Sequence, residues 1–251
     1  MKRLGCTTAL LAMLSAHAAG AQEIPADSAA TLQPPVYEAS YLAEAMGLSA
    51  TARRVQTRSE DGLYTLENSL SLTLLGATVG TVIETSAFRL QDERVIPEHY
   101  HYSQTGLSAR EETVAFDWQA MSARSSRDTE SWSLPLSRGM QDRQSLSQEI
   151  AQQLGSQRGT RMRFHVVDGN EVEEHVYRLE GEQVLQTPVG ALQTLRLQRV
   201  RSAHSGRRTT IWLASDWHHV LVQLEDVSAS GRMTRLSLQT AKVNGRTLEG
   251  M

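Results

Sequence analysis

Residues 111–118 read Glu-Glu-Thr-Val-Ala-Phe-Asp-Trp, and the larger side chains Val114, Phe116 and Trp118 alternate with smaller or more polar ones. Glu112 lies on the same side of this alternation. A period of two is typical of a β-strand that turns one face toward a core. This stretch therefore predicts a half-buried β-strand.

The same period recurs on both sides of this stretch. It is present in Leu70–Leu74, Met162–Val166, Val172–Val176, Thr209–Leu213 and Val220–Leu224. Turn-forming residues such as Asp168-Gly169-Asn170 separate the runs. Strands that follow one another at roughly 8–12-residue spacing, without helices between them, favour antiparallel neighbours. The predicted fold is mainly β: a single antiparallel, strongly curved sheet or half-open barrel with one or two short helices.

One segment, Asp142–Leu154, has the period of a helix instead. Asp142 is suited to cap its beginning and Gly155 to end it. Its apolar stripe, at i, i+4 and i+8, consists of Leu146, Ile150 and Leu154. We expect a second short helix at Leu42–Gly47.

The first 21 residues have the three parts of a cleavable secretory signal. Lys2 and Arg3 form a positive start, an apolar stretch follows, and Ala19-Gly20-Ala21 supplies the small residues of a cleavage site. We expect cleavage before Gln22 and a periplasmic location; the alternative is a short uncleaved anchor. After the signal, no apolar stretch approaches the roughly 20 residues of a membrane-spanning helix.

Composition narrows the function classes. The only cysteine, Cys6, lies inside the expected signal, so the remainder has no disulfide, cysteine ligand or cysteine nucleophile. The formal net charge is −3 and the arginines are spread along the chain, which does not fit a nucleic-acid partner. The predicted organisation is a signal at 1–21, a disordered tether at 22–35, a β-rich domain at 36–245 and a flexible tail at 246–251.

Motifs that carry enzymatic chemistry are missing. The chain contains neither the Gly-x-Ser-x-Gly of a nucleophile elbow nor the glycine-rich loops that hold phosphates or dinucleotides. We therefore assign no catalytic residue and expect no cofactor.

Two histidines could hold a metal ion. His99 and His101 would share one face of a strand, and His165 or the His218-His219 pair could supply a third ligand. Half-exposed surface histidines are the simpler interpretation, and we assign no metal site. The pairs Glu111-Glu112 and Glu173-Glu174 are interpreted as solvated strand edges.

Three aromatic residues, Phe116, Trp118 and Trp212, are candidates for the wall of a ligand-binding pocket on a concave sheet face. The alternative is that they fill the core, as aromatic residues of large sheets commonly do.

Several short, mostly aromatic phrases occur in a fixed order along the chain. They are Tyr37-Glu38-Ala39-Ser40-Tyr41, Ser86-Ala87-Phe88, Ile96-Pro97-x-x-Tyr100, Phe116-Asp117-Trp118, Asp142-x-x-Ser145, Gly181-x-x-x-Leu185-x-Thr187-Pro188-x-Gly190 and Thr210-Ile211-Trp212-Leu213-Ala214. In order and spacing they resemble the bacterial envelope family named domain of unknown function 3108, from about Val36 to Gly245. The resemblance implies an exported, mostly antiparallel β protein and no assigned activity.

Three functions stay open at this point. The first is a non-enzymatic envelope binding or assembly factor that holds an apolar or lipid-like ligand, or an envelope protein, against a curved sheet. The second is a hydrolase of a cell-envelope polymer with carboxylates such as Asp117 and Asp142 in one cleft. The third is a structural factor whose exposed edge strand pairs with a partner.

Overall fold

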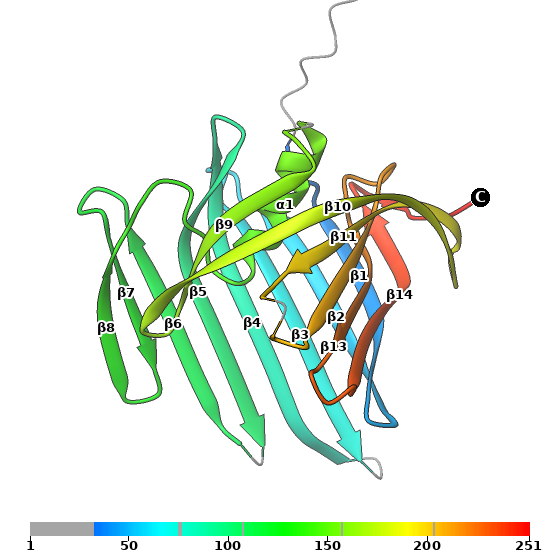
Figure 1. Cartoon of the computed structure of the whole chain (residues 1–251), viewed down its shortest axis with the longest axis horizontal. Helices are drawn as coiled ribbons and strands as arrows, with labels where there is room; N and C mark the ends of the chain where they lie inside the picture. Colours follow the sequence, from blue (N-terminus) through cyan, green and yellow to red (C-terminus); the bar gives the residue numbers. More distant parts are fainter. Residues whose placement is uncertain (1–32, 75–76, 107, 157, 203) are drawn as a thin grey trace, which may run out of the picture. The chain divides into compact units, whose positions relative to one another are not determined.

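A computed structural model describes residues 33–251 except 75–76, 107, 157 and 203. The expected secretory signal and nearly all of the expected tether lie outside these described residues. Figure 1 shows the described part as one long sheet with a single helix, α1.

The first half of the sheet is an uninterrupted antiparallel meander of eight strands. They are β1 (Tyr37–Ala45), β2 (Leu48–Arg58), β3 (Tyr64–Leu74), β4 (Ala77–Gln91), β5 (Arg94–Gly106), β6 (Arg110–Asp117), β7 (Ser122–Arg127) and β8 (Glu130–Pro135).

Helix α1 (Ser145–Gly155) separates this meander from a second one. The later strands are β9 (Arg161–Asp168), β10 (Glu171–Thr187), β11 (Gly190–Val200), β12 (Arg208–Ala214), β13 (Leu221–Val227), β14 (Met233–Val243) and the short β15 (Arg246–Thr247). Every strand pairing is antiparallel, including that of β15 with β14.

Strand β1 joins the two meanders because it pairs with β2 on one side and with β14 on the other. In the described residues the result is one 15-stranded sheet with β8 and β9 at its ends, not closed into a barrel. The sheet curves strongly enough that Val167 of β9 packs with Tyr100 of β5 and Val114 of β6. The predicted antiparallel, curved, mainly β fold is confirmed.

The alternation seen in the sequence places the core. Val114 and Phe116 of β6 are buried, as are Met162, Phe164 and Val166 of β9. The β9 residues pack with the apolar face of α1, and those of β6 pack with Val167 on the other face of β9. Strand β9 therefore contributes to two core clusters, one on each side.

The predicted helix is also confirmed, but it begins at Ser145 with Gln144 at the N-cap position, and Asp142 lies in the turn before it. The Asp142 carboxylate accepts hydrogen bonds from the backbone N–H of Gln144 and of Ser145, both at 2.8 Å. The Asp142 carbonyl accepts from the N–H of Leu146 at 3.2 Å, so a turn that Asp142 caps leads into α1. The helix ends at Gly155, as the sequence predicted.

Two expectations, the second helix and the flexible tail, are wrong. Residues 42–47 form no helix: they end β1 and turn into β2, because pairing on both sides of β1 outweighs the helical preference of Ala-Glu-Ala. Residues 246–251 are not a loose tail, since β15 pairs with β14 and Leu248 is fully buried. At the boundary of the expected tether, Pro35 is buried and its carbonyl accepts from the Gln56 side-chain amide; residues 22–32 of the tether lie outside the described residues.

Candidate functional site

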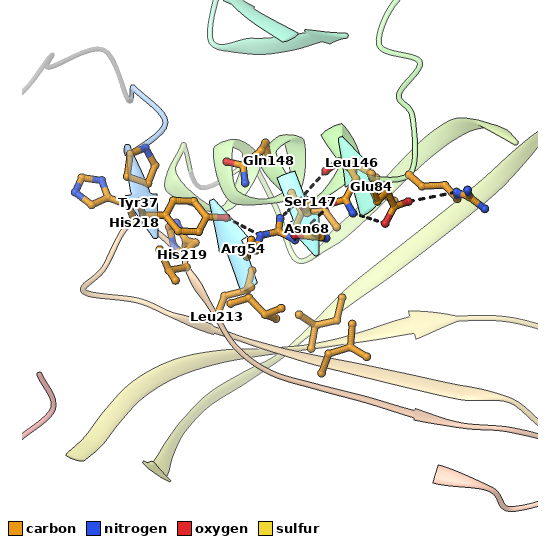
Figure 2. A pocket seen from close by; sticks show the side chains of 18 of the residues that line it. Tyr37, Arg54, Asn68, Glu84, Leu146, Ser147, Gln148, Leu213, His218 and His219 are labelled. Carbon is orange, nitrogen blue, oxygen red and sulfur yellow. Dashed lines mark hydrogen bonds and ion pairs between the residues drawn. The ribbon is translucent and has the colours of Figure 1, made fainter. Parts of the chain in front are cut away.

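A cavity of about 280 Å³ lies between α1 and the sheet. Figure 2 shows its lining, which comes from α1 and the segment before it, from β1 to β4, and from β10, β12 and β13 with the turn that joins the last two. The site therefore exists only where both meanders meet under the helix.

One wall of this cavity is apolar. It consists of Leu146 and Ile150 of α1, Tyr177 of β10, Ile211 and Leu213 of β12, and Val220, Leu221 and Leu224 around β13. The inward alternation of β12 and the stripe of α1 together bring these side chains to the same space. A hydrocarbon group could be buried against this wall.

The opposite wall is polar and centres on Arg54 of β2, which is only 8% exposed. Its Nε donates to the Tyr37 hydroxyl at 2.6 Å, and Nη1 donates to Asn68 Oδ1 at 3.2 Å. Nη1 also donates to Gln144 Oε1 at 3.4 Å, and Nη2 donates to the Ser147 hydroxyl. Each of these four acceptors is a neutral group, and Figure 2 shows Tyr37, Asn68 and Ser147 grouped around the guanidinium.

Arg54 keeps its charge although it is buried. Burial by itself lowers the pKa of Arg54, but the Tyr37 and Tyr41 phenols and the Glu84 carboxylate hold it above its ordinary value. Within the described part of the chain Arg54 forms no ion pair, because Gln144 stands between it and Glu84. The Gln144 amide accepts from Arg54 through its oxygen and donates to Glu84 through its nitrogen. A buried cation therefore borders the cavity without a carboxylate in contact.

The polar wall continues across the sheet in register. Arg54 is paired with Asn68, Asn68 with Glu84, Glu84 with Tyr102, Tyr102 with Glu112 and Glu112 with Arg127, so these six residues form one row across β2 to β7. We call this set the polar row.

Arg143, from the turn before α1, lies over the far half of the polar row. It donates to Glu112 Oε2 at 2.7 Å, and its guanidinium lies 5.2 Å from the ring centroids of Tyr100 and of Tyr102. The buried Glu112 carboxylate also contacts Arg110 and Arg127. The interpretation of Glu112 as a solvated edge residue is therefore wrong, since three arginines surround it.

The turn at the cavity rim has an unusual backbone. His218 and His219, which line the cavity, have φ of 51° and 58°, and the N–H of Val220 donates to the Trp217 carbonyl at 3.0 Å. Two successive positive φ values define a type I′ turn, for which Asn-Gly is preferred. Burial, followed by the neighbouring His218, holds the pKa of His219 below its usual value of 6.5, so that its ring is neutral at pH 7.

We expect the double substitution H218N/H219G to raise the free energy of unfolding by about 1 kcal/mol, because it relieves the left-handed backbone of two bulky residues. Urea unfolding at neutral pH measures this. The control is M46N in the β1–β2 turn, where φ is 50° at Met46 and 78° at Gly47; it should also stabilise the fold, away from the cavity. A loss of stability in H218N/H219G would show that contacts of the two imidazoles stabilise the fold by more than the left-handed backbone destabilises it.

The three aromatic candidates do not share one site. Phe116 is in the core and stacks on Trp118 with ring centroids 5.8 Å apart, whereas Trp212 is buried in a separate core cluster. Trp118 is half-buried and lines a cleft outside the α1 cavity. A ligand-binding role for the three stays a prediction, and none of them lines the α1 cavity.

The cleft beside Trp118 is larger, about 1020 Å³, but most of its cations have carboxylate partners, and Arg138, the cation on it that forms no ion pair within the described residues, is exposed rather than buried. Arg89 pairs with Glu98 at 2.8 Å and Arg94 with Glu149 at 2.6 Å. Arg163, also on this cleft, pairs with Glu174. Because these three cations already have carboxylate partners, and Arg54 is a buried cation that has none in the described part of the chain, we regard the smaller cavity beside Arg54 as the stronger candidate site.

The structure gathers neither the candidate metal ligands nor the candidate hydrolase carboxylates into one site. Among the residues that the structure describes, no group of three or more His, Cys, Asp or Glu could hold a metal ion. Asp117 is exposed and accepts from the backbone N–H of Gln119 and Ala120, whereas Asp142 is fully buried under α1. The hydrolase hypothesis thus loses the carboxylate pair on which it rested.

No described helix has both the length and the apolar character needed to cross a membrane.

Comparison with known proteins matches the chain to one family model and to solved structures. A family model described as "Protein of unknown function (DUF3108)" matches residues 36–237. The crystal structure of a β-barrel-like protein of domain of unknown function DUF1849 from Brucella abortus matches with a TM-score of 0.56 at 8% sequence identity, over 84% of this chain and 98% of that chain. At that identity the structural match shows a shared fold alone. No curated protein matches the sequence.

Proposed function

We propose, from the premise that this chain belongs to the DUF3108 family of proteins of unknown function, that it is an exported, non-enzymatic protein that binds an apolar or amphipathic ligand in the α1 cavity. The observation that carries the proposal is the cavity of about 280 Å³ with one apolar and one polar wall. Ligand pockets are commonly built this way, with mostly apolar linings and a few placed polar groups.

A binding role fits the side chains better than hydrolysis does. Asp142 and Glu112 are bound to backbone N–H groups or arginines and so have structural partners. General acid–base work needs a group within reach of a substrate proton, and neither of these carboxylates lines the cavity. Glu84 does line it, but both of its oxygens accept hydrogen bonds, from the Tyr100 hydroxyl and from the Gln144 amide.

Strand-edge pairing with an envelope protein has less support. At one end of the sheet the segment at Gln141 bridges to Val166 and so covers part of the β9 edge. At the other end, β8 is six residues long and closes on Pro135, which are features that blunt an edge.

To test ligand binding, the protein is purified from its native compartment and extracted for mass spectrometry, and a fluorescent fatty-acid probe is titrated. Native material should release a small apolar molecule, and the probe should bind with one site. L224W should weaken probe binding at least tenfold, because Leu224 lines the cavity and indole would fill it. The matched control L48W changes a leucine that is 51% exposed and should bind like the wild type. Solvent-only extracts together with no probe uptake would end this proposal.

Export is tested separately. Mass spectrometry of the periplasmic fraction should find a chain that begins at Gln22, because the small residues before it form the cleavage site. An intact chain beginning at Met1 in the cytosolic fraction would contradict export without bearing on ligand binding.

A further inference from the structure

We infer that the ligand of the α1 cavity is a single-chain amphiphile with one carboxylate head, held by Arg54, with its chain against the apolar wall. This inference rests on the proposed function and names the chemical class of the ligand. It depends on Arg54, on the charges around it and on the layout of the two walls.

The charge balance of the polar row and its neighbours is positive. Four cations, Arg54, Arg110, Arg127 and Arg143, meet three carboxylates, Glu84, Glu112 and Asp168. Ion pairs connect Arg110, Arg127 and Arg143 to these carboxylates, and Arg54 is left with neutral partners. The surplus positive charge is therefore that of Arg54, which lines the cavity.

The Arg54 guanidinium also has hydrogen-bonding capacity to spare. A guanidinium carries five N–H groups. Among the described residues, Arg54 donates to Tyr37, Asn68, Gln144 and Ser147, which takes four of them and leaves one on Nη2. The contact with Gln144, at 3.4 Å, is the longest of the four. An entering carboxylate could take the free N–H, displace this contact and bind in the two-point geometry that arginine favours.

The surroundings specify a single negative charge. Arg143 also lines the cavity but is held by Glu112 and by the Tyr100 hydroxyl. His219, on the rim, offers no second positive charge, because burial and, to a smaller extent, the neighbouring His218 lower its pKa. A dianionic phosphate would therefore lack a second available cation, whereas one carboxylate matches the surplus of one.

The layout of the walls specifies a chain attached to that head. Leu213 and Leu224 line the same cavity as Arg54, and Figure 2 shows Leu213 opposite the guanidinium. A second cavity, of about 190 Å³, shares Arg54, Asn68 and Glu84 with the first. The head position therefore lies where the two cavities meet, and the leucines of the α1 cavity receive the chain.

The test compares four probes that share one alkyl chain: decanoate, decanol, decyltrimethylammonium and decyl phosphate. Each competes with a fluorescent probe for the purified, delipidated protein. We expect decanoate to bind roughly ten times more tightly than decanol or the ammonium, because a charge-assisted hydrogen bond to a buried cation is gained. Decyl phosphate should bind more weakly than decanoate.

Variants assign this preference to one residue. R54M should bring decanoate and decanol to nearly equal affinity, because decanoate loses much more affinity than decanol does, and R54K should keep part of the preference. R124M removes one positive charge from an exposed position on β7 and should behave like the wild type. Since R54M could fail to fold, R54K and the wild-type selectivity carry the test by themselves.

The failures are distinguishable. Equal binding of decanoate and decanol by the wild type would overturn the carboxylate head and leave ligand binding standing. Tighter binding of decyl phosphate would overturn the single-charge assignment. Binding of no probe at all would remove the proposed function and this inference together.

Discussion

Replacing Glu112 with glutamine is expected to lower the free energy of unfolding by about 3–5 kcal/mol, because it leaves a cluster of partly buried arginines without their shared counter-ion. The Glu112 side chain is 5% exposed, and its two oxygens contact Arg110, Arg127 at 2.8 Å and Arg143 at 2.7 Å. Glutamine has the same shape but offers one acceptor oxygen and adds two N–H donors that face cations.

Arg127 and Arg143 would keep a weaker partner in Asp168, at 3.1 and 3.7 Å, and Arg143 would also keep Glu84 at 3.6 Å. Arg110 would keep no ion pair among the described residues. The Nε atom of Arg110 is already buried without a hydrogen-bond partner within the described part of the chain. The loss should therefore be larger than for any single surface ion pair.

The measurement is chemical denaturation at neutral pH, with E111Q as the matched control. Glu111 is the next residue on β6, its side chain is 69% exposed, and its ion-pair contact, to His101, is 3.2 Å long. E111Q should change stability by less than about 1 kcal/mol. If the free energy of unfolding of E112Q lies within about 1 kcal/mol of the wild-type value, the carboxylate does not stabilise the arginine cluster. The polar row would then contribute little to the stability of the fold.

Adjacent like charges explain why the sequence predicted the strands and not the polar row. In a strand, neighbouring residues point to opposite faces, so one member of Arg53-Arg54 and one of Glu111-Glu112 must face inward. Arg53 pairs with Glu38 on the exposed side, and Arg54 is the buried one. The alternation thus contained a signal for two inward charges, but it does not say which strands bring such charges together.

The position of the cavity depends on pairing between strands that are far apart in the sequence. The cavity needs β1 beside β14, and residues about 200 positions apart make that pairing, as Ser40 and Thr240 do. No local period specifies such a partner. The helix, by contrast, was predictable because its stripe and the turn that Asp142 caps are local features of 13 residues, Asp142–Leu154. The helix expected at Leu42–Gly47 is absent because pairing of β1 with β2 and with β14 outweighs the local helical preference of these residues. Such pairing is not a local feature of the sequence.

Asp142 should make the stability of the protein depend on pH between about 4 and 6. Burial raises the pKa of Asp142 from 3.8 to about 6, against the opposing hydrogen bonds from Ser145, Ser86 and Gln144. The folded state therefore holds the proton more tightly than the unfolded state does. This contribution to stability is complete below pH 3.8 and is lost as the pH rises through about 6. The gap between the two values corresponds to about 3 kcal/mol.

The variant D142N removes the titrating carboxyl group and can keep its hydrogen bonds. Its amide oxygen can accept from the N–H groups of Gln144 and Ser145, and its NH₂ can donate to the Ser86 hydroxyl, which donates to Asp142 in the native chain. From about pH 4 to pH 7, the stability of D142N should therefore rise relative to that of the wild type by about 2 kcal/mol.

The comparison of the two profiles isolates this one residue, because every other titrating group is common to both proteins. D117N is the matched control: Asp117 also accepts backbone N–H groups in a turn, but it is exposed, and its variant should follow the wild-type profile. Parallel profiles for D142N and the wild type would mean that water reaches Asp142 beneath α1. The helix would then be a mobile cover over the cavity, and the burial that leaves Arg54 without a counter-ion would have to be reconsidered along with it.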